Sequence, residues 1–486
     1  MEPVLTPDAM GDADRRTIAA GTPVEVLMDR AGRAVAWEVR RLAHGTYGRR
    51  VVLVCGKGNN GGDGLVAARV LASWGMRPRV FELAAGIDHA AFTRALRRSD
   101  VAVDAMYGTG FRGALEGDAA FVADALAAWR GPTVSVDIPS GVDGLRGVVF
   151  GPVVRATRTV TFAARKPGLV FEPGRSHAGE IVVADIGIDV GDGTHAGLIT
   201  AADVQAWLPA RAPDAHKWES AVMVVGGSGG MTGAPMFVSH AAMRAGAGIV
   251  WCGLPGEDAA RAASGSEVIT RVLPANRAGV LTRDAAESVL ATIGRFSALA
   301  LGPGLGGVGD GDLEFVVRTL VAEARAPLVL DADGLNALDG DFTPLEARTT
   351  LGAPAVLTPH AGEYQRLMGR PVGDDRLEAA CALADRAGAV VLLKGPGTVV
   401  AAPDGRLALN PTGGAELATA GSGDVLTGIV AGFLARGMDA FAAAAAGAWV
   451  HGRTADELVE RNGPGLVAGD LVGGLQRTLL SLGVAS

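Results

Sequence analysis

The sequence predicts two successive α/β domains, and three observations lead to that prediction. From residue 50 onward, short β-branched runs alternate with longer helical patterns, which is typical of a parallel sheet with helices on both faces. A second alternating series opens at residue 221. The chain has 486 residues, too many for one ordinary hydrophobic core. We therefore expect a Rossmann-like, doubly wound domain over residues 1–205 and a second α/β domain over residues 206–486.

The first series supplies the elements of the first domain. Each expected strand is a short β-branched run, and each expected helix is a longer segment rich in Ala and Leu. The strands lie at residues 51–55, 78–83, 101–106, 133–138, 158–163 and 179–186. The helices lie at residues 65–74 and around residues 95–99 and 122–129.

The second series repeats this alternation with Ala-rich helices between the strands. Its strand-like runs lie at residues 221–227, 248–254, 297–304, 327–334, 355–360, 389–395 and 398–402. The Ala-rich run at residues 440–450 is too short for a membrane span and indicates a packed helix. We expect the two domains to join around residues 191–215.

Composition restricts the partners and the compartment. A formal charge of -8 disfavours a nucleic-acid partner. The N-terminal run MEPVLTPDAMGDADRR is acidic and polar, unlike a secretory signal. Cys55, Cys252 and Cys381 lie far apart, which favours buried thiols in a reducing compartment. We expect a cytoplasmic homo-oligomer that acts on small molecules and has no membrane or nucleic-acid partner.

The glycine-rich segment GKGNNGGDG (residues 56–64) follows the first expected strand and precedes a helix. Such a density of glycine indicates a backbone that approaches a ligand closely, and the helix start that follows offers N–H groups to an anion. Gly56, Gly58 and Gly61 also satisfy G-x-G-x-x-G, so a dinucleotide-binding turn is one interpretation of this segment. Capping of the helix alone is the simpler alternative.

Polar groups follow three later strands of the first domain. They lie in DAMYGTGFRG (residues 104–113), DIPSGVDG (residues 137–144) and TFAARKPGL (residues 161–169). Ligands of doubly wound sheets bind beyond the carboxyl ends of the strands, so these loops should converge on the glycine-rich segment. Lys166 in the third loop is available for a phosphate.

NNGGDGLVAARVL, DAMYGTGFRG, DIPSG and TFAARKPGL resemble, in order and spacing, the NAD(P)H-hydrate epimerase family over about residues 1–205. The resemblance implies that Asp137 is the acid–base residue and that Asn60, Asp104 and Ser140 bind a potassium ion. Oxygen donors suit such a hard cation. It further implies that the substrate is bound by Asn59, Asn60, Gly61, Gly62, Asp63, Gly108, Thr109, Gly110, Phe111, Arg112, Gly113 and Lys166.

The most specific string of the second domain is TAGSGDVLTGIVAGFLARG (residues 419–437). Gly421, Ser422 and Gly423 offer backbone N–H groups at a helix start, and Asp424 adds a carboxylate. An anion hole beside a carboxylate suits phosphoryl transfer to a hydroxyl group, because the acid accepts the hydroxyl proton. The simpler alternative is an ordinary first-turn Asp.

GGSGGMTGA, DADGLN, LTPHAGE and ATAGSGDVLTG resemble the ribokinase-like NAD(P)H-hydrate dehydratase family over about residues 216–486. The family phosphorylates the hydroxyl group of the hydrate with ADP or ATP, with Mg²⁺, and phosphate then leaves. The resemblance implies that Asp424 is the base and that Ala234, Gly304 and His360 contact the hydrate. It places the nucleotide against Lys394, Gly395, Pro396, Gly397, Thr398 and Gly423.

Two stretches depart from the dehydratase pattern. The family has Asn-x-Gly where this chain has Gly414 and Glu416, and the glycine-rich lead-in is altered to KWESAVMVVGG. A carboxylate added near phosphates should weaken nucleotide binding through repulsion of like charges.

The two resemblances together imply a bifunctional enzyme that repairs hydrated NADH and NADPH. One alternative makes the second domain a kinase of a sugar or a hydroxymethylpyrimidine. Another makes the first domain a dinucleotide-binding module without catalysis.

Overall fold

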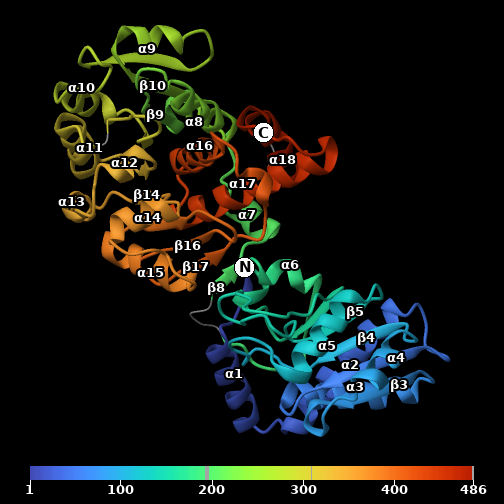
Figure 1. Cartoon of the computed structure of the whole chain (residues 1–486). Coiled ribbons are helices and arrows are strands. Elements are labelled where there is room, and N and C mark those ends of the chain that lie inside the picture. Colours follow the sequence, from blue (N-terminus) through green and yellow to red (C-terminus); the bar gives the residue numbers. More distant parts are fainter. Residues whose placement is uncertain (192–195, 308, 484–486) are drawn as a thin grey trace. The chain divides into compact units, whose positions relative to one another are not determined.

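The computed structural model describes residues 1–191, 196–307 and 309–483, and it divides into two compact bodies (Figure 1). The N-terminal body comprises Glu2–Ala196, and the C-terminal body comprises Gly197–Ser486 together with Met1. The domain boundary that we placed after residue 205 stays a prediction. Residues 192–195 of the expected junction lie outside the described residues.

The N-terminal body is built on a parallel sheet with the strand order β3-β2-β4-β5-β6-β7. The middle strands are buried in a hydrophobic core on each face of the sheet, as their near-continuous apolar runs predict. The strands are β2 (Arg50–Cys55), β3 (Arg77–Glu82), β4 (Val101–Ala105), β5 (Thr133–Val136), β6 (Arg158–Phe162) and β7 (Glu180–Ala184).

Helices cover both faces of this sheet, which confirms the doubly wound arrangement (Figure 1). α2 (Val24–Leu42) and α3 (Asn59–Ser73) pack on the face that carries Leu53 and Cys55. α4 (His89–Leu96) and α5 (Gly117–Ala128) pack on the opposite face. The remaining elements of this body are β1 (Glu2–Val4), α1 (Pro7–Ala19), α6 (Gly174–Ala178) and the short 3₁₀ turns η1 (Leu83–Ala85) and η2 (Pro167–Leu169).

Helix α3 begins six residues earlier than the sequence predicts, at Asn59 instead of residue 65. A Cβ on Gly61 would lie 2.0 Å from the carbonyl oxygen of Gly56, and one on Gly64 would lie 2.6 Å from Cβ of Ala105. None of the glycines of residues 56–64 has a positive φ. Gly61 and Gly64 are therefore required for close packing of the first turns of the helix, not for a loop conformation.

The C-terminal body has a larger sheet in which the strands follow the order β8-β17-β16-β15-β14-β13-β12-β9-β10-β11. The strands from β11 to β15 pair in parallel, while β16 pairs antiparallel with both of its neighbours. The strands are β8 (Ala196–Leu198), β9 (Ala221–Val225), β10 (Ile249–Pro255), β11 (Ile269–Leu273), β12 (Ala298–Leu301), β13 (Leu328–Leu330), β14 (Ala355–Leu357), β15 (Val390–Leu393), β16 (Val399–Ala401) and β17 (Leu407–Leu409).

Helix α16 (Ser422–Ala435) packs on α8 (Gly233–Arg244) so closely that two positions admit only glycine. A Cβ on Gly428 would lie 2.2 Å from the carbonyl oxygen of Val238. A Cβ on Gly432 would lie 2.9 Å from the carbonyl oxygen of Ala242. The middle of α16 is thereby packed closely against α8, and the first turn of the same helix carries the candidate base.

The Ala-rich run at residues 440–450 lies inside helix α17 (Ala440–Asn462), as predicted. Among the described helices, none combines the length and the hydropathy that a membrane span requires. The other elements of this body are α7 (Ala201–Trp207), η3 (Lys217–Ser220), α9 (Gly256–Ala262), α10 (Asp284–Ile293), α11 (Gly311–Glu323), α12 (Asp333–Asn336), α13 (Thr343–Thr350), α14 (Ala361–Met368), α15 (Arg376–Ala387), η4 (Ala415–Leu417) and α18 (Ala468–Ser481).

Candidate active sites

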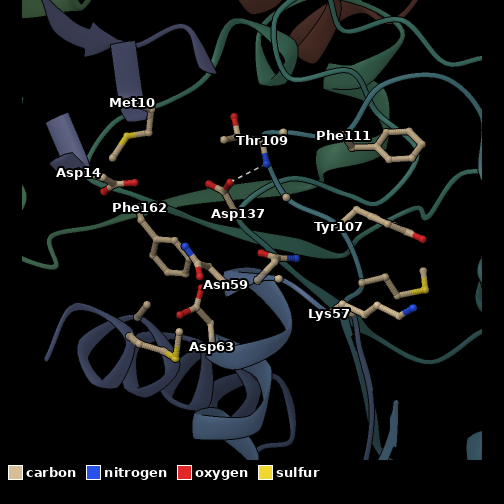
Figure 2. Close-up of a pocket in the computed structure, with 18 of the residues that line it drawn as sticks. Met10, Asp14, Lys57, Asn59, Asp63, Tyr107, Thr109, Phe111, Asp137 and Phe162 are labelled. Carbon is tan, nitrogen blue, oxygen red and sulfur yellow. Dashed lines mark hydrogen bonds between the residues drawn. The ribbon is translucent and has the colours of Figure 1, made fainter. Parts of the chain in front are cut away.

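A cavity of about 810 Å³ opens in the N-terminal body at the carboxyl ends of its strands, where the loops were expected to converge (Figure 2). A volume of this size is typical of pockets that bind small molecules or cofactors. Of the predicted site residues, the cavity is lined by Asn59, Asn60, Asp63, Gly108, Thr109, Gly110, Phe111, Asp137 and Lys166.

The other predicted residues of this site do not line the cavity. A Cβ on Gly62 would lie 2.7 Å from the methyl group of Met28, so Gly62 packs against α2. Arg112 donates hydrogen bonds to the carbonyl oxygens of Thr109 and Phe111, at 3.2 and 2.8 Å, and so stiffens its own loop. Like Gly61, Gly62 and Arg112, Gly113 is not among the lining residues.

Asp137 is held in the cavity by three donors. Its Oδ1 accepts hydrogen bonds from Lys166 Nζ at 2.7 Å and from Thr161 Oγ1 at 3.1 Å. Its Oδ2 accepts one from the N–H of Thr109 at 3.0 Å. The backbone of Asp137 has φ of 65°, a conformation that costs energy for a non-glycine residue and occurs often at functional sites.

Lys166 is fully buried and forms an ion pair with Asp137. Its Nζ also donates to the carbonyl oxygen of Phe162 at 3.0 Å and to Thr161 Oγ1 at 2.9 Å. A buried ammonium needs a counter-charge and hydrogen-bond acceptors, and these partners supply both. The structure therefore uses Lys166 to hold a carboxylate, whereas the sequence had suggested a contact with phosphate.

Asp104 and Ser140 form a buried hydrogen-bond network beneath the cavity. Asp104 accepts four hydrogen bonds, from Met106 N–H, Ser135 Oγ, and the N–H and Oγ of Ser140. Ser140 Oγ in turn accepts the N–H of Tyr107 at 3.0 Å. Burial raises the pKa of Asp104, and these hydrogen bonds act against that rise. The network fixes the loop that follows β4.

Asp14 is a cavity residue that sequence reasoning missed. It lies on α1, far in the sequence from the strand ends, and Met10 and Ile18 line the cavity with it. The spacing of four residues places Met10, Asp14 and Ile18 on one face of the helix, and that spacing was the available signal. Burial raises the pKa of Asp14, while the positive charge of Lys166 lowers it.

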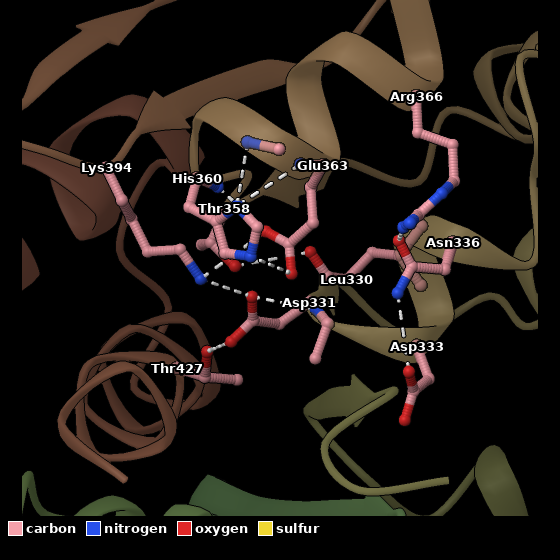
Figure 3. Close-up of polar contacts among 12 residues, drawn as sticks. Leu330, Asp331, Asp333, Asn336, Thr358, His360, Glu363, Arg366, Lys394 and Thr427 are labelled. Carbon is pink, nitrogen blue, oxygen red and sulfur yellow. Dashed lines mark hydrogen bonds and ion pairs between the residues drawn. The ribbon is translucent and has the colours of Figure 1, made fainter. Parts of the chain in front are cut away.

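In the C-terminal body, Asp331, Lys394 and Thr427 join three elements at the carboxyl end of the sheet (Figure 3). Lys394 Nζ donates to Asp331 Oδ1 at 2.6 Å and lies 3.8 Å from Glu363 Oε2. Thr427 Oγ1 of α16 donates to Asp331 Oδ2 at 2.6 Å. Burial lowers the pKa of Lys394, but the negative charges of Asp331 and Glu363 outweigh burial and raise the pKa above its usual value.

Asp424 lies in the first turn of α16, beside this network. The pKa of Asp424 is raised to about 7, first by burial and then by the negative charge of Asp331, while the positive charge of Lys394 acts against the rise. A Cβ on Gly423 would lie 3.6 Å from Lys394 Nζ, so the lysine ammonium stands at the N-terminus of the helix. The arrangement joins a proton acceptor, free helix N–H groups and a cation, which suits phosphoryl transfer.

The predicted contacts to the hydrate come from three segments, namely the first turn of α8, the loop after β12 and the N-cap of α14. A Cβ on Gly304, whose φ is 68°, would lie 3.2 Å from Cβ of Ala234, so these two residues are neighbours. His360 Nδ1 accepts the N–H groups of Gly362 and Glu363, at 2.9 and 3.2 Å, and caps α14. The cap fixes the orientation of the ring, and the imidazole itself is exposed.

Arg376 supports the predicted nucleotide loop, and the sequence gave no signal for this role. Its guanidinium donates to the carbonyl oxygens of Leu393, Lys394 and Gly397 at 3.2–3.3 Å. Thr398 Oγ1 donates to the carbonyl oxygen of Gly395 at 3.3 Å and closes the turn. Gly395, Pro396, Gly397 and Thr398 thus form one tight turn after β15.

The family departure at Gly414 and Glu416 lies at η4, shortly before α16. A Cβ on Gly414 would lie 2.8 Å from Glu416 Oε2, so the carboxylate fills the space where the family has an amide. His451 on α17 is buried nearby, and its Nε2 has no hydrogen-bond partner among the described residues. Burial lowers the pKa of His451 to about 4.

Comparison with known proteins agrees with this geometry. Residues 222–477 match the model of the NAD(P)H-hydrate dehydratase family, and residues 24–91 and 81–168 match that of the YjeF-related protein N-terminus. A bifunctional NAD(P)H-hydrate repair enzyme of Moorella thermoacetica is 41% identical over 99% of this chain and 97% of the relative. The chain belongs to the bifunctional NAD(P)H-hydrate repair enzyme family. A relative from Salinibacter ruber with the same description is 40% identical over 97% of this chain and 95% of its own length.

One solved member of the dehydratase family has the same fold as the C-terminal body. It is the ADP/ATP-dependent NAD(P)H-hydrate dehydratase of Bacillus subtilis, co-crystallized with ATP and Mg²⁺. It is 31% identical, with a TM-score of 0.52, and the match covers 59% of this chain and 99% of that one. The ribokinase-like fold expected for the C-terminal body is thereby confirmed.

Proposed function

We propose that this chain is an enzyme that repairs hydrated NADH and NADPH in two steps. The N-terminal body, with residues 1–205 as its domain, interconverts the two epimers of the hydrate. The C-terminal body, with residues 206–486 as its domain, dehydrates the S epimer with ADP or ATP. Family membership over nearly the full length supports the pairing of the two activities.

The observation that carries the dehydratase activity is Asp424, a carboxyl group with a pKa near 7 at the start of α16. Asp424 accepts the proton of the hydroxyl group of the hydrate as that oxygen attacks the terminal phosphorus of the nucleotide. The N–H groups of α16 and the ammonium of Lys394 offset the charge on the transferred group. The carbon–oxygen bond then breaks, phosphate leaves, and the ring loses a proton to restore the reduced nicotinamide.

Magnesium bound with the nucleotide fits the acidic residues at this site. Asp331, Glu363 and Asp424 gather there, and carboxylate oxygens are preferred ligands of Mg²⁺. No group of three His, Cys, Asp or Glu side chains within the described ranges forms a metal cage of its own. A cation shared with the phosphates of the nucleotide needs no such cage.

Potassium at the N-terminal site would be held by Asn60, Asp104 and Ser140. The donor set fits the ion, because Asn60 has a buried Nδ2 without a partner and rotation of the amide would present an oxygen there. Asp104 brings a buried negative charge to the same network. The positive charge of the ion would hold the phosphate-binding loops together.

The assembly and the compartment belong to the same proposal. Cys55, Cys252 and Cys381 are free thiols, which supports a cytoplasmic, reducing environment. We propose a homo-oligomer, and light scattering of the purified protein measures its mass directly.

The deciding experiment incubates purified protein with mixed hydrate epimers, Mg²⁺, potassium, and ADP or ATP. Complete conversion to the reduced cofactor with release of inorganic phosphate supports both activities. Conversion of the S epimer alone refutes the epimerase, and a stable phosphorylated product refutes the dehydratase in favour of a kinase. Omission of potassium in a parallel reaction tests the ion.

A further inference from the structure

Two of the carboxyl groups that line the cavity of the N-terminal body, those of Asp63 and Asp137, have opposite surroundings. Asp137 is fully partnered, with Lys166 and Thr161 on one oxygen and the N–H of Thr109 on the other. Asp63 lines the same cavity and is 8% exposed. Among the described residues, no hydrogen bond or ion pair joins the Asp63 carboxyl to a partner. The carboxyl group of Asp63, unlike that of Asp137, therefore stays available to a ligand.

The groups that face Asp63 are acidic. They are Asp14 from α1 and Asp137 from the loop after β5 (Figure 2). The pKa of Asp63 is raised to about 8, first by burial and then by the negative charges of Asp137 and Asp14. Lys166 is the cation at this end of the cavity, but its ammonium pairs with Asp137. A protonated carboxyl and a carboxylate paired with an ammonium thus share one cavity.

The environment of Asp63 does not suit a phosphate group of the substrate. A carboxyl group repels a diphosphate when it is ionised, and its cluster with Asp14 and Asp137 concentrates negative charge. Figure 2 shows these three side chains pointing into the cavity from different elements, with Lys57 apart from them. The end of the cavity at Asp63 suits the uncharged ring of the substrate.

We propose, on the basis of the epimerase function proposed above, that Asp63 and Asp137 are an acid–base pair acting on opposite faces of the hydrate ring. Asp63 gives its proton to the hydroxyl oxygen as the carbon–oxygen bond breaks, and water leaves. The lone pair of the adjacent ring nitrogen forms a double bond to the same carbon. Water then adds from the opposite face, its proton passes to Asp137, and the electron pair returns to nitrogen.

The step is balanced and reversible. One water leaves and one enters, no oxidation occurs, and one proton moves from Asp63 to Asp137, after which solvent restores both groups. The opposite epimer reacts by the reverse path, with the roles of the two carboxyls exchanged. Many enzymes catalyse acid–base reactions with two titratable groups whose environments move their pKa values apart.

The test compares Asp63→Asn with the unchanged full-length protein, using separated epimers and chromatography of the products. We expect kcat for epimerisation to fall about 100-fold or more, with KM changed less than about threefold. The dehydratase activity of the same molecules reports the amount of intact protein. Asp124→Asn is the matched control, because it makes the same change at an exposed position on α5 that does not line the cavity.

Two further readouts separate catalysis from binding. Epimerisation by the unchanged protein should decline above about pH 8, and this decline should be absent from the residual activity of Asp63→Asn. In water enriched in ¹⁸O, each epimerisation should add one labelled oxygen. Full kcat in Asp63→Asn, a change confined to KM, or epimerisation without label would overturn the acid–base pair. Absence of epimerisation in the unchanged protein would instead refute the proposed function itself.

Discussion

Lys394 Nζ lies 2.6 Å from Asp331 Oδ1 and joins the loop after β15 to the loop after β13. Both side chains are largely buried, at 18% and 2% exposure. Removing one partner of a buried pair leaves an uncompensated charge, which costs about 3–5 kcal/mol. We expect Lys394→Met to destabilise the C-terminal body by that order in a urea titration. Exposed Lys217→Met is the control, and equal stability of the two variants would contradict the pair's structural role.

The dehydratase rate should rise with pH through about 7, because Asp424 must be ionised to accept the hydroxyl proton. Asp424→Asn should abolish release of inorganic phosphate while sparing epimerisation. Asp331→Asn removes a negative charge that raises the pKa of Asp424, so the rising limb should move to lower pH. A limb that stays in place in Asp331→Asn would show that another group controls it.

Gly61→Ala should unfold or distort the start of α3. The new methyl group would lie 2.0 Å from the carbonyl oxygen of Gly56, and overpacking of this kind costs about 1–3 kcal/mol or more. Gly58→Ala is the matched control, because no atom lies within 4 Å of the corresponding position. Thermal unfolding of both variants, with hydrate binding measured by calorimetry, checks this prediction.

Asp63→Asn should stabilise the N-terminal body at neutral pH. The pKa of Asp63 rises from 3.8 to about 8 on folding, so its contribution is complete below pH 3.8 and declines as pH rises toward 8. Asn carries no charge and escapes that decline. We expect a gain on the order of 1–4 kcal/mol at pH 7 and little gain at pH 3.5, measured by denaturant titration at both values. A gain independent of pH would argue against a buried proton on Asp63.

Glu416→Gln should lower KM for ADP or ATP severalfold, since it removes a negative charge from the approach to α16. The double variant Gly414→Asn, Glu416→Gly restores the family pattern and should lower KM further. The double change is required because a side chain on Gly414 would meet Glu416. Glu257→Gln, at an exposed position on α9, controls for net charge. Unchanged KM in both Glu416 variants would place the carboxylate away from the nucleotide.

The positions of most parallel strands followed from the sequence, because buried parallel strands are continuous apolar runs. Their order within each sheet came only from the structure. β11 was missed: it carries Thr270 and Arg271 and lies at the edge of the sheet, where burial no longer imposes an apolar run. β17 has three residues and no pattern to read. The start of α3 was misplaced because glycine signals loops as strongly as it signals close packing.

The sites were predictable where loops follow strands and unpredictable where helices supply the residues. Asp137 and Lys166 were found from the rule for carboxyl ends of strands, although their mutual ion pair was not. Asp14 and His451 lie on helices distant in sequence, and Arg376 acts through backbone carbonyl groups. Only the folded chain brings such residues to a site.

Both candidate sites are carried by one polypeptide, in separate bodies with their own sheets. Translation therefore delivers the two in equal numbers, whatever the level of expression. A cell that makes this protein has no means of adjusting one capacity by gene dosage without adjusting the other. Any difference between the rates of the two reactions must come from the turnover numbers of the two sites.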